Sequence, residues 1–354
     1  MTKSTSLPPN APTTNGTVPS VTGRGEVDVM PVSQSSPLSP STGVLSSSSH
    51  TLQDVCASLH AQVTAFLSSP PPDDITRTTQ EQTRVAWQVI EEALDRYSFQ
   101  HVSLSYNGGK DCLVLLIIYL AVLHSHYTRP SSSPQTKKSD SFPQTIPSIY
   151  AKPPDPFPSV SSFVDYSSRL YHLDLTHIST NPGPHKKHRS HSNPPLTTPP
   201  PKLDPSTTTS HEIPAPTQPK PTISFRDAFA LYLDSHPSVR AIFVGTRRTD
   251  PHGGHLTHFD PTDHNWPSFM RIHPVIDWHL SEIWCFLRSP CLKDLEDGSP
   301  LKYCAMYDQG YTSLGGVNDT LRNPELKYID ANGSEKYRPA HEMTWDEGER
   351  LGRE

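Results

Sequence analysis

The sequence predicts an α/β fold, an open and mostly parallel sheet with helices on both faces. Short β-like runs alternate along the chain with stretches of helical spacing, the order that builds βαβ units. A glycine pair also separates one such run from the helix after it, as at the turn of a βα unit. No internal repeat is visible, so the alternation indicates one sheet rather than an array of repeats.

The individual elements follow from hydrophobic periodicity. The predicted strands are His101–Ser105, Pro147–Ala151, Leu170–Leu175 and Ala241–Gly245. The predicted helices are Leu52–Phe66, Val85–Ala93, Lys110–His124, Phe225–Leu233 and Leu280–Leu287. The helix beginning at Lys110 is apolar nearly all round, which predicts that it is buried.

Composition limits how much of the chain can fold. Only 33% of the 354 residues are hydrophobic, and 39 are proline, so much of the length offers no core. Residues 1–50 are rich in Ser, Thr and Pro and are expected to form a disordered arm. Similar stretches at about 128–143 and 181–221 are expected to be insertions at surface turns. Residues 51–354 are then a single domain.

Charge and cysteine usage exclude several classes of protein. A net charge of −6 does not suit a nucleic-acid partner, and the basic run 186–189 is interpreted as a solvated loop. The five cysteines form no C-x-x-C pair, so neither a zinc site nor an iron–sulfur cluster is expected, and reduced thiols suit the cytoplasm. The N-terminus lacks an apolar signal core, and Leu113–Leu123 is too short to span a bilayer, so no membrane partner is expected.

The most informative segment runs from Val102 to Asp111, VSLSYNGGKD. Gly108 and Gly109 let the backbone turn tightly and approach a ligand without a Cβ clash. The free N–H groups of the helix that follows then face whatever occupies the turn, and Lys110 adds positive charge. Asn107 can donate to a phosphate oxygen, and Asp111 in the first helical turn could hold a magnesium ion. The segment therefore predicts a phosphate-binding loop.

This loop is neither a Walker A motif nor a dinucleotide fingerprint, because the spacing of its glycines fits neither pattern. It resembles the pyrophosphate loop of the adenine nucleotide alpha-hydrolase superfamily, usually written S-G-G-K-D-S, whose members cleave ATP between the α and β phosphates. Asn107 replaces the first Ser of that pattern and Cys112 the last. The resemblance implies a fold like that of phosphoadenosine phosphosulfate (PAPS) reductase.

The sequence does not fit three other groups of the superfamily. It lacks the paired cysteines of the tRNA-thiolating enzymes and the C-terminal cysteine of the sulfate reductases. It also has no room for the glutaminase domain of the amidotransferase-coupled members. The Asn-type loop instead resembles that of the eukaryotic, particularly fungal-type, FAD synthase (FMN adenylyltransferase) family. Four further segments agree with that family in the right order: 245–251 (GTRRTDP), 263–271 (DHNWPSFMR), 307–315 (YDQGYTSLG) and 349–353 (ERLGR). The resemblance covers about residues 80–354 apart from the insertions.

The resemblance implies that FMN and ATP are substrates, that FAD is the product, and that Mg²⁺ accompanies ATP. It assigns catalytic roles to Asn107, Asp111, Asp250 and Arg350, with Asp111 as the metal ligand. The residues expected to bind ATP and its phosphates are Leu104, Ser105, Tyr106, Gly108, Gly109, Lys110, Ala151, Thr246, Arg247 and Arg248. The expected flavin contacts are Asp263, Trp266 and Arg353.

Two features of this site can be argued from chemistry. Trp266 offers an aromatic wall and Asp263 an acceptor for the flavin N3–H. Arg350 and Arg353 lie three residues apart, which on a helix places both on one face, where they can close over the nucleotides.

Two alternatives stay open: another nucleotidyltransferase of the superfamily, or a nucleotide-binding regulator without activity. A monomer with small-molecule partners only is expected.

Overall fold

The computed structural model describes residues 50–129, 141–181 and 223–353. These residues all belong to one compact unit. The predicted arm at 1–50 and the predicted insertions at 128–143 and 181–221 lie outside the described residues, except at their edges.

This unit contains a six-stranded sheet with the strand order β3-β2-β1-β4-β6-β5. Its strands are β1 (Val102–Ser105), β2 (Ile146–Lys152), β3 (Leu173–Ser179), β4 (Ala241–Phe243), β5 (Phe259–Pro261) and β6 (Met270–Ile272). Neighbouring strands are parallel except for β5, which runs antiparallel to β6 at one edge. The prediction of a mostly parallel sheet is therefore confirmed.

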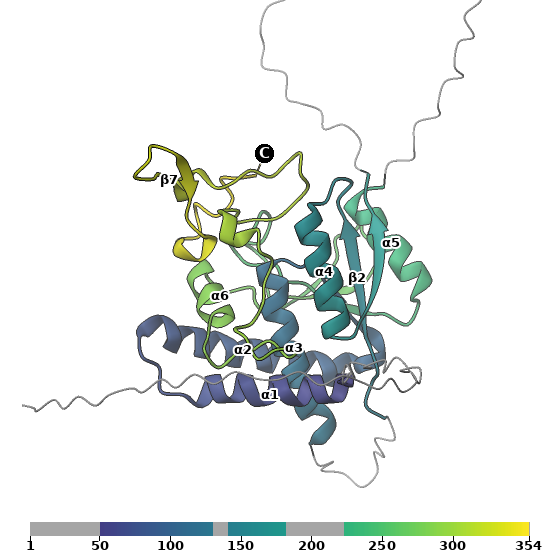
Figure 1. The fold of residues 1–354 in the computed structure, drawn as a ribbon. Helices are drawn as coiled ribbons and strands as arrows, with labels where there is room; N and C mark the ends of the chain where they lie inside the picture. Colours follow the sequence, from purple (N-terminus) through teal and green to yellow (C-terminus); the bar gives the residue numbers. More distant parts are fainter. Residues whose placement is uncertain (1–49, 130–140, 182–222, 354) are drawn as a thin grey trace, which may run out of the picture. The chain divides into compact units, whose positions relative to one another are not determined.

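Helices cover both faces of this sheet. The helices are α1 (Leu52–Ser68), α2 (Asp74–Tyr97), α3 (Lys110–Thr128), α4 (Pro158–Leu170), α5 (Phe225–Ser235) and α6 (Leu280–Leu287). Because β1–α3–β2 and β2–α4–β3 cross the sheet in the same direction, right-handed connections put α3 and α4 on one face. Helix α5 packs against β2 and β3 on the other face, while α1 and α2 pack on α3 (Figure 1).

The core is divided by the sheet. Leu104 of β1 belongs to the larger hydrophobic cluster, which includes α3 and the helices packed on it. Ile149 of β2 and Ile242 of β4 belong to a smaller cluster with Phe229 and Tyr232 of α5. This division reflects the two-residue period of a strand, which points successive side chains to opposite faces.

Helix α3 is the buried helix that the sequence predicts, although it is longer than predicted and ends at Thr128. Among the described helices, it has the length and apolar composition that could cross a membrane. Every residue from Cys112 to Leu123 is buried in the fold. Contact with α1, α2 and α6, and of Tyr119 with Phe243 of β4, accounts for that composition.

Other boundaries differ from the prediction. The predicted strand Leu170–Leu175 begins too early, because Leu170 ends α4 and His172 adopts a positive φ of 53° before β3 starts. The Ser-rich sequence of α4 hid its amphipathic face. The sequence does not predict the short strands β5 and β6 or the hairpin of β7 (Lys327–Ile329) with β8 (Glu335–Tyr337), because each of these three-residue segments contains a charged residue and lies in no apolar run.

The strand order places the phosphate-loop sequence at a special point. From β1 the chain moves outward through β2 to β3 and then returns to β4 on the other side of β1. Ligands of open α/β sheets bind at such a reversal, beyond the carboxyl ends of the strands. A ligand-binding site is therefore expected at the carboxyl ends of β1 and β4.

Candidate active site

A cavity of about 330 Å³ lies at the carboxyl ends of β1 and β4. Its walls come from the turn after β1, the segment after β4, the start of α5 and the C-terminal part of the chain. The residues that line it are Ser105, Asn107, Gly109, Lys110, Asp111, Cys112, Phe225, Val244, Gly245, Thr246, Asp250, Pro251, Tyr307, Ser313, Leu314, Glu349, Arg350 and Arg353. A cavity of about 200 Å³ shares Asn107, Phe225, Leu314 and Arg353 with it and extends to Ala151.

Residues 106–110, the phosphate loop, form a turn held by hydrogen bonds and close contacts. The amide oxygen of Asn107 accepts from the Gly109 N–H at 2.9 Å and faces the Cys112 thiol at 2.9 Å. Gly108 has a φ of +74°, and a Cβ there would stand 2.8 Å from a methyl carbon of Val164. Both its conformation and its close contact with α4 therefore require glycine.

Lys110 does not extend freely into the cavity. Its side chain is buried, and its ammonium pairs with Asp111 at 3.0 Å and with Glu349. Burial opposes its charge, but the two carboxylates outweigh this effect and raise the pKa of Lys110. Its backbone N–H donates to the Tyr307 hydroxyl at 2.9 Å. The first amide of α3 therefore already has a partner.

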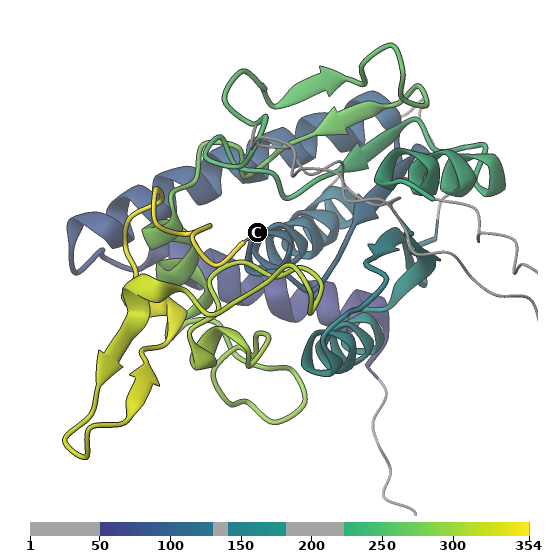
Figure 2. The same cartoon turned by 90° about the horizontal axis from the view of Figure 1, so that it is seen from above.

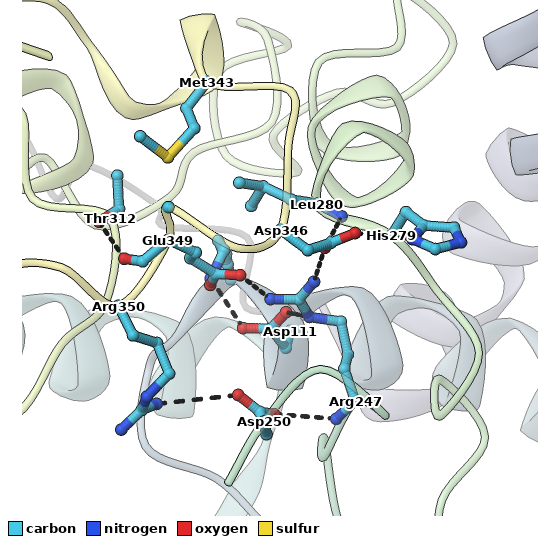
Figure 3. Close-up of polar contacts among 12 residues, drawn as sticks. Asp111, Arg247, Asp250, His279, Leu280, Thr312, Met343, Asp346, Glu349 and Arg350 are labelled. Carbon is cyan, nitrogen blue, oxygen red and sulfur yellow. Dashed lines mark hydrogen bonds and ion pairs between the residues drawn. The ribbon is translucent and has the colours of Figure 1, made fainter. Parts of the chain in front are cut away.

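Arg247 was expected to bind phosphate, and the structure places its side chain elsewhere. The guanidinium is fully buried among three carboxylates, with ion pairs to Asp111 at 2.6 Å, to Asp346 at 2.9 Å and to Glu349 (Figure 3). Burial opposes its charge, but Asp111 and Glu349 raise its pKa. The side chain does not line either cavity. A cation surrounded by carboxylates holds the site together, and its charge is directed at them rather than at the cavities.

Arg248 also points away from the cavities. Its guanidinium pairs with Asp277 at 2.6 Å and donates to the Leu256 carbonyl at 2.9 Å. This geometry gives no support to the expectation that Arg248 contacts ATP phosphates.

Asp250 and Asp111 are two carboxylates at one cavity. The Asp250 carboxylate accepts from the Arg247 N–H at 2.9 Å and faces the Arg350 guanidinium at 3.8 Å (Figure 3). Burial and the nearby charge of Asp111 raise the pKa of Asp250. A cation between the two carboxylates would relieve this repulsion. The described residues contain no cluster of three or more His, Cys, Asp or Glu side chains that could hold a metal. A Mg²⁺ ion here would therefore need phosphate and water ligands as well, which is its usual habit.

The residues expected near adenosine are divided between cavity and core. Ser105 and Thr246 line the larger cavity, and Ala151 lines the smaller one. Leu104 and Tyr106 are buried, and the Tyr106 hydroxyl donates to Ser167 of α4 at 2.8 Å. These last two can offer a ligand only their backbone.

Asp263 and Trp266, two of the three predicted flavin contacts, line neither of these two cavities. Asp263 is exposed, with Arg271 at 3.9 Å. The Trp266 ring lies 6.4 Å from the ring of Phe225 and 6.0 Å from that of Phe229, centroid to centroid. Because Phe225 lines both cavities, Trp266 stands one aromatic ring behind the wall.

The C-terminal segment reaches the cavity, although the helix assumed for it is wrong. Residues 346–352 form successive turns rather than an α-helix. Arg350 and Arg353 nevertheless both line the larger cavity, and Arg353 donates to the Leu314 carbonyl at 2.6 Å and faces Asp319 at 3.4 Å. Figure 2 shows this segment passing over the end of α3, in agreement with the Lys110–Glu349 ion pair.

Sequence reasoning missed the acidic and polar residues that hold this segment. Asp346 accepts from the Leu280 N–H at 2.8 Å, and Asn323 is buried and donates to the Gly348 carbonyl at 2.7 Å. Glu349 is the first residue of the ERLGR motif, so the motif itself could have identified it. The sequence interpretation assigned roles only to the two arginines of that motif. Nothing local marks Asp346 or Asn323, because their partners are far away in the sequence.

The chain is similar to known proteins over most of its length. The family described as the phosphoadenosine phosphosulfate reductase domain matches residues 101–322. "Probable FAD synthase" of Schizosaccharomyces pombe is 33% identical over 288 residues, which cover 81% of this chain and 84% of that protein. "Flavin adenine dinucleotide synthase" of Saccharomyces cerevisiae is 30% identical over 287 residues, 80% of this chain and 77% of that protein.

Solved structures give the same result. The crystal structure of Candida glabrata FMN adenylyltransferase in complex with FAD and inorganic pyrophosphate superposes with a TM-score of 0.64 at 25% identity. The match covers 86% of this chain and 97% of that one. Yeast FAD synthetase in complex with FAD superposes with a TM-score of 0.63 at 25% identity, over 86% of this chain and 100% of that one.

Proposed function

We propose that this chain, which belongs to the FAD synthase family with its phosphoadenosine phosphosulfate reductase domain, transfers the adenylyl group of ATP to FMN and releases FAD and pyrophosphate. The observation that carries the proposal is one cavity that the phosphate loop and the ERLGR tail build together. Loop and tail are the two motifs farthest apart in the sequence, and they meet where an α/β sheet binds nucleotides.

The reaction needs positioning more than it needs a base. The FMN phosphate has a second pKa of about 6, so it is largely a dianion at neutral pH. One of its oxygens forms a bond to the α-phosphorus of ATP while the bond to the β-phosphate bridging oxygen breaks. The electron pair leaves with pyrophosphate. The chain's task is to bring two anions together and to compensate their charge.

The cavity supplies groups suited to that task. The Asn107 side-chain N–H₂ has no hydrogen-bond partner among the described residues, and it can donate to a phosphate oxygen. Arg350 and Arg353 bring two guanidinium groups to the same cavity. Lys110 lines the wall as well, and reaching a phosphate would require it to leave Glu349. Asp263 and Trp266 stay proposed flavin contacts, although neither lines the two cavities: Trp266 lies behind Phe225, and Asp263 is exposed beside Arg271.

Mg²⁺ enters this scheme with ATP. It would neutralise phosphate charge, and Asp250 and Asp111 are the carboxylates at the cavity that would hold it. Both oxygens of Asp111 pair with Lys110 and Arg247, so binding the ion would require Asp111 to give up one of these contacts. The raised pKa of Asp250 beside Asp111 supports this placement, because a divalent cation favours the ionised form of both.

Two properties are proposed from less specific observations. We propose that the chain works as a monomer, because one chain supplies every wall of the cavity. We also propose that it works in the cytoplasm, since its five cysteines are unpaired, as suits a reducing compartment. Light scattering of the pure protein and imaging of a fluorescent fusion test these two points.

The test of the function is direct. The pure protein is incubated with FMN and MgATP, and FAD and pyrophosphate are measured by chromatography and a coupled assay. We expect the two products in equal amounts with FMN, and none with riboflavin, which lacks the nucleophilic phosphate. Product with another phosphate acceptor but not with FMN would identify a different nucleotidyltransferase. Nucleotide binding without any product would identify a regulator.

A further inference from the structure

Glu349 is a carboxylate in the wall of a cavity whose proposed ligands are anions. An anion there repels phosphates unless its own charge is compensated. Its side chain is only 6% exposed, and each of its two oxygens pairs with a different buried cation. One oxygen pairs with Lys110 and the other with Arg247, and Figure 3 shows the Arg247 pair. The carboxylate is therefore occupied with the protein's own cations.

These two cations belong to different elements. Lys110 is the first residue of α3 and the last of the phosphate loop, while Arg247 follows β4. One carboxylate thus joins the ends of two neighbouring strands to the C-terminal tail. Aspartate in place of Glu349 would be shorter by one methylene and would span the two cations less well.

The backbone of the same residue is also held. The Glu349 carbonyl accepts from the Thr312 hydroxyl, and the Asn323 amide donates to the carbonyl before it, that of Gly348. Both Thr312 and Asn323 are buried. The main chain is therefore fixed immediately before Arg350, whose guanidinium faces Asp250 across the cavity.

We propose that Glu349 is a positioning residue for adenylyl transfer, which acts by clamping Lys110 and Arg247 and thereby placing Arg350 at the reacting phosphates. The two ion pairs of Glu349 explain why the ERLGR motif begins with an acidic residue although the proposed ligands of the cavity are anions. This role of Glu349 rests on the proposed function, and it is separable from it, because the wild-type chain must make FAD before any variant is compared.

The first test replaces Glu349 with glutamine, which keeps the shape and removes the charge. We expect kcat to fall on the order of 10²-fold, the scale of a misplaced catalytic group, with little change in the KM for MgATP. Glu349→Asp keeps the charge and should recover part of the loss. Glu347→Gln is the matched control, because Glu347 is exposed in the same segment. A wild-type kcat in Glu349→Gln would overturn the proposal.

The decisive test is a double-mutant cycle with Arg350→Ala. If Glu349 acts through Arg350, the double variant should be no slower than Arg350→Ala alone. Independent, multiplicative losses would overturn the proposal, as would a rise in the Mg²⁺ concentration needed for half-maximal rate, which would make Glu349 a metal ligand. If Glu349→Gln does not fold, the same cycle is run with Glu349→Asp.

Discussion

Asn107 uses the two ends of its amide for different tasks. The oxygen accepts from the Gly109 N–H and so stabilises the turn, whereas the N–H₂ group has no partner among the described residues. A serine at this position could accept the same hydrogen bond, but it would present a single O–H to a ligand. The asparagine therefore combines a structural acceptor with a donor for phosphate.

Two substitutions separate these tasks. Asn107→Asp keeps the acceptor for Gly109 but loses the donor and adds a negative charge, so it should keep the melting temperature and lose on the order of 10²-fold in kcat. Asn107→Ala should lose both activity and some stability. Steady-state kinetics and thermal unfolding check this pair. Normal turnover in Asn107→Asp would show that no phosphate contact is made there.

His273 is a buried histidine, and neither ring nitrogen makes a well-aligned hydrogen bond among the described residues. The nearby Val244 backbone favours the protonated ring but is outweighed by burial. Burial, with a contribution from Arg271, lowers its pKa to about 4. In the unfolded chain the pKa is about 6.5, so the unfolded state binds more protons between these two values. The stability that neutral His273 contributes is complete above pH 6.5 and is lost as the pH falls towards 4.

We therefore expect the free energy of unfolding to fall by up to about 3 kcal/mol between pH 6.5 and pH 4 through this residue. His273→Phe should remove that part of the pH dependence, because phenylalanine binds no proton. The measurement is urea unfolding at pH 7 and pH 4.5, with the exposed His255→Gln as control. An unchanged pH dependence in His273→Phe would show that the ring is solvated or paired.

At the scale of elements, the phosphate loop depends on the helix beside it. Gly108 needs a positive φ and has no room for a Cβ because α4 packs against it at Val164. This contact joins a loop that the sequence predicted to a helix that it did not. The glycine pair could be recognised from its spacing, but the reason for Gly108 becomes visible only once α4 is placed.

Gly108→Ala should destabilise the chain by about 1–2 kcal/mol for the left-handed conformation, with a further cost from the contact with Val164. Turnover should fall as well, because the loop must shift. Gly254→Ala is the matched control, since a Cβ there meets no atom within 4 Å. Thermal unfolding and FAD formation are measured for both. Equal stability of the two variants would contradict the account of the loop.

The same contrast holds for other elements. Helix α3 and strand β4 could be predicted from local sequence. Each lies in a continuous run of apolar residues, long in α3 and short in β4. The tail could not, since its turns follow from contacts with Arg247 and Asn323, residues that precede it by many positions. Its arginines were recognised by resemblance, and their assumed helix was wrong.

At the scale of the whole molecule, the sequence predicted the edge of the sheet at which the site lies, but not how charge is distributed there. Lys110 and Arg247 were expected to face phosphates, as cations near a phosphate loop usually do. The structure surrounds them with Asp111, the residue after Lys110, and with Asp346 and Glu349 of the C-terminal segment. Local sequence cannot reveal this, because a buried charge is compensated by whichever partner the fold brings to it.

The ends of one predicted insertion are held together by the fold itself. Asn181 and Ile223 exchange two backbone hydrogen bonds, at 2.8 Å and 3.1 Å, at the point where β3 ends and α5 is about to begin. Ser224, the next residue, caps α5 through its contact with Asp227. The residues on either side of 182–222 are therefore adjacent in the fold.

We expect that residues 182–222 can be replaced by a short Gly-Ser linker without loss of FAD formation. A shorter loop costs less entropy to close, so the melting temperature should stay within about 4 °C of the parent or rise. The control places the same linker between residues 179 and 225, which removes the Asn181–Ile223 pair and the Ser224 cap and should lower the melting temperature. Both chains are compared by thermal unfolding and steady-state kinetics. A large loss of stability in the first replacement, equal to that of the control, would show that residues within 182–222 pack against the fold.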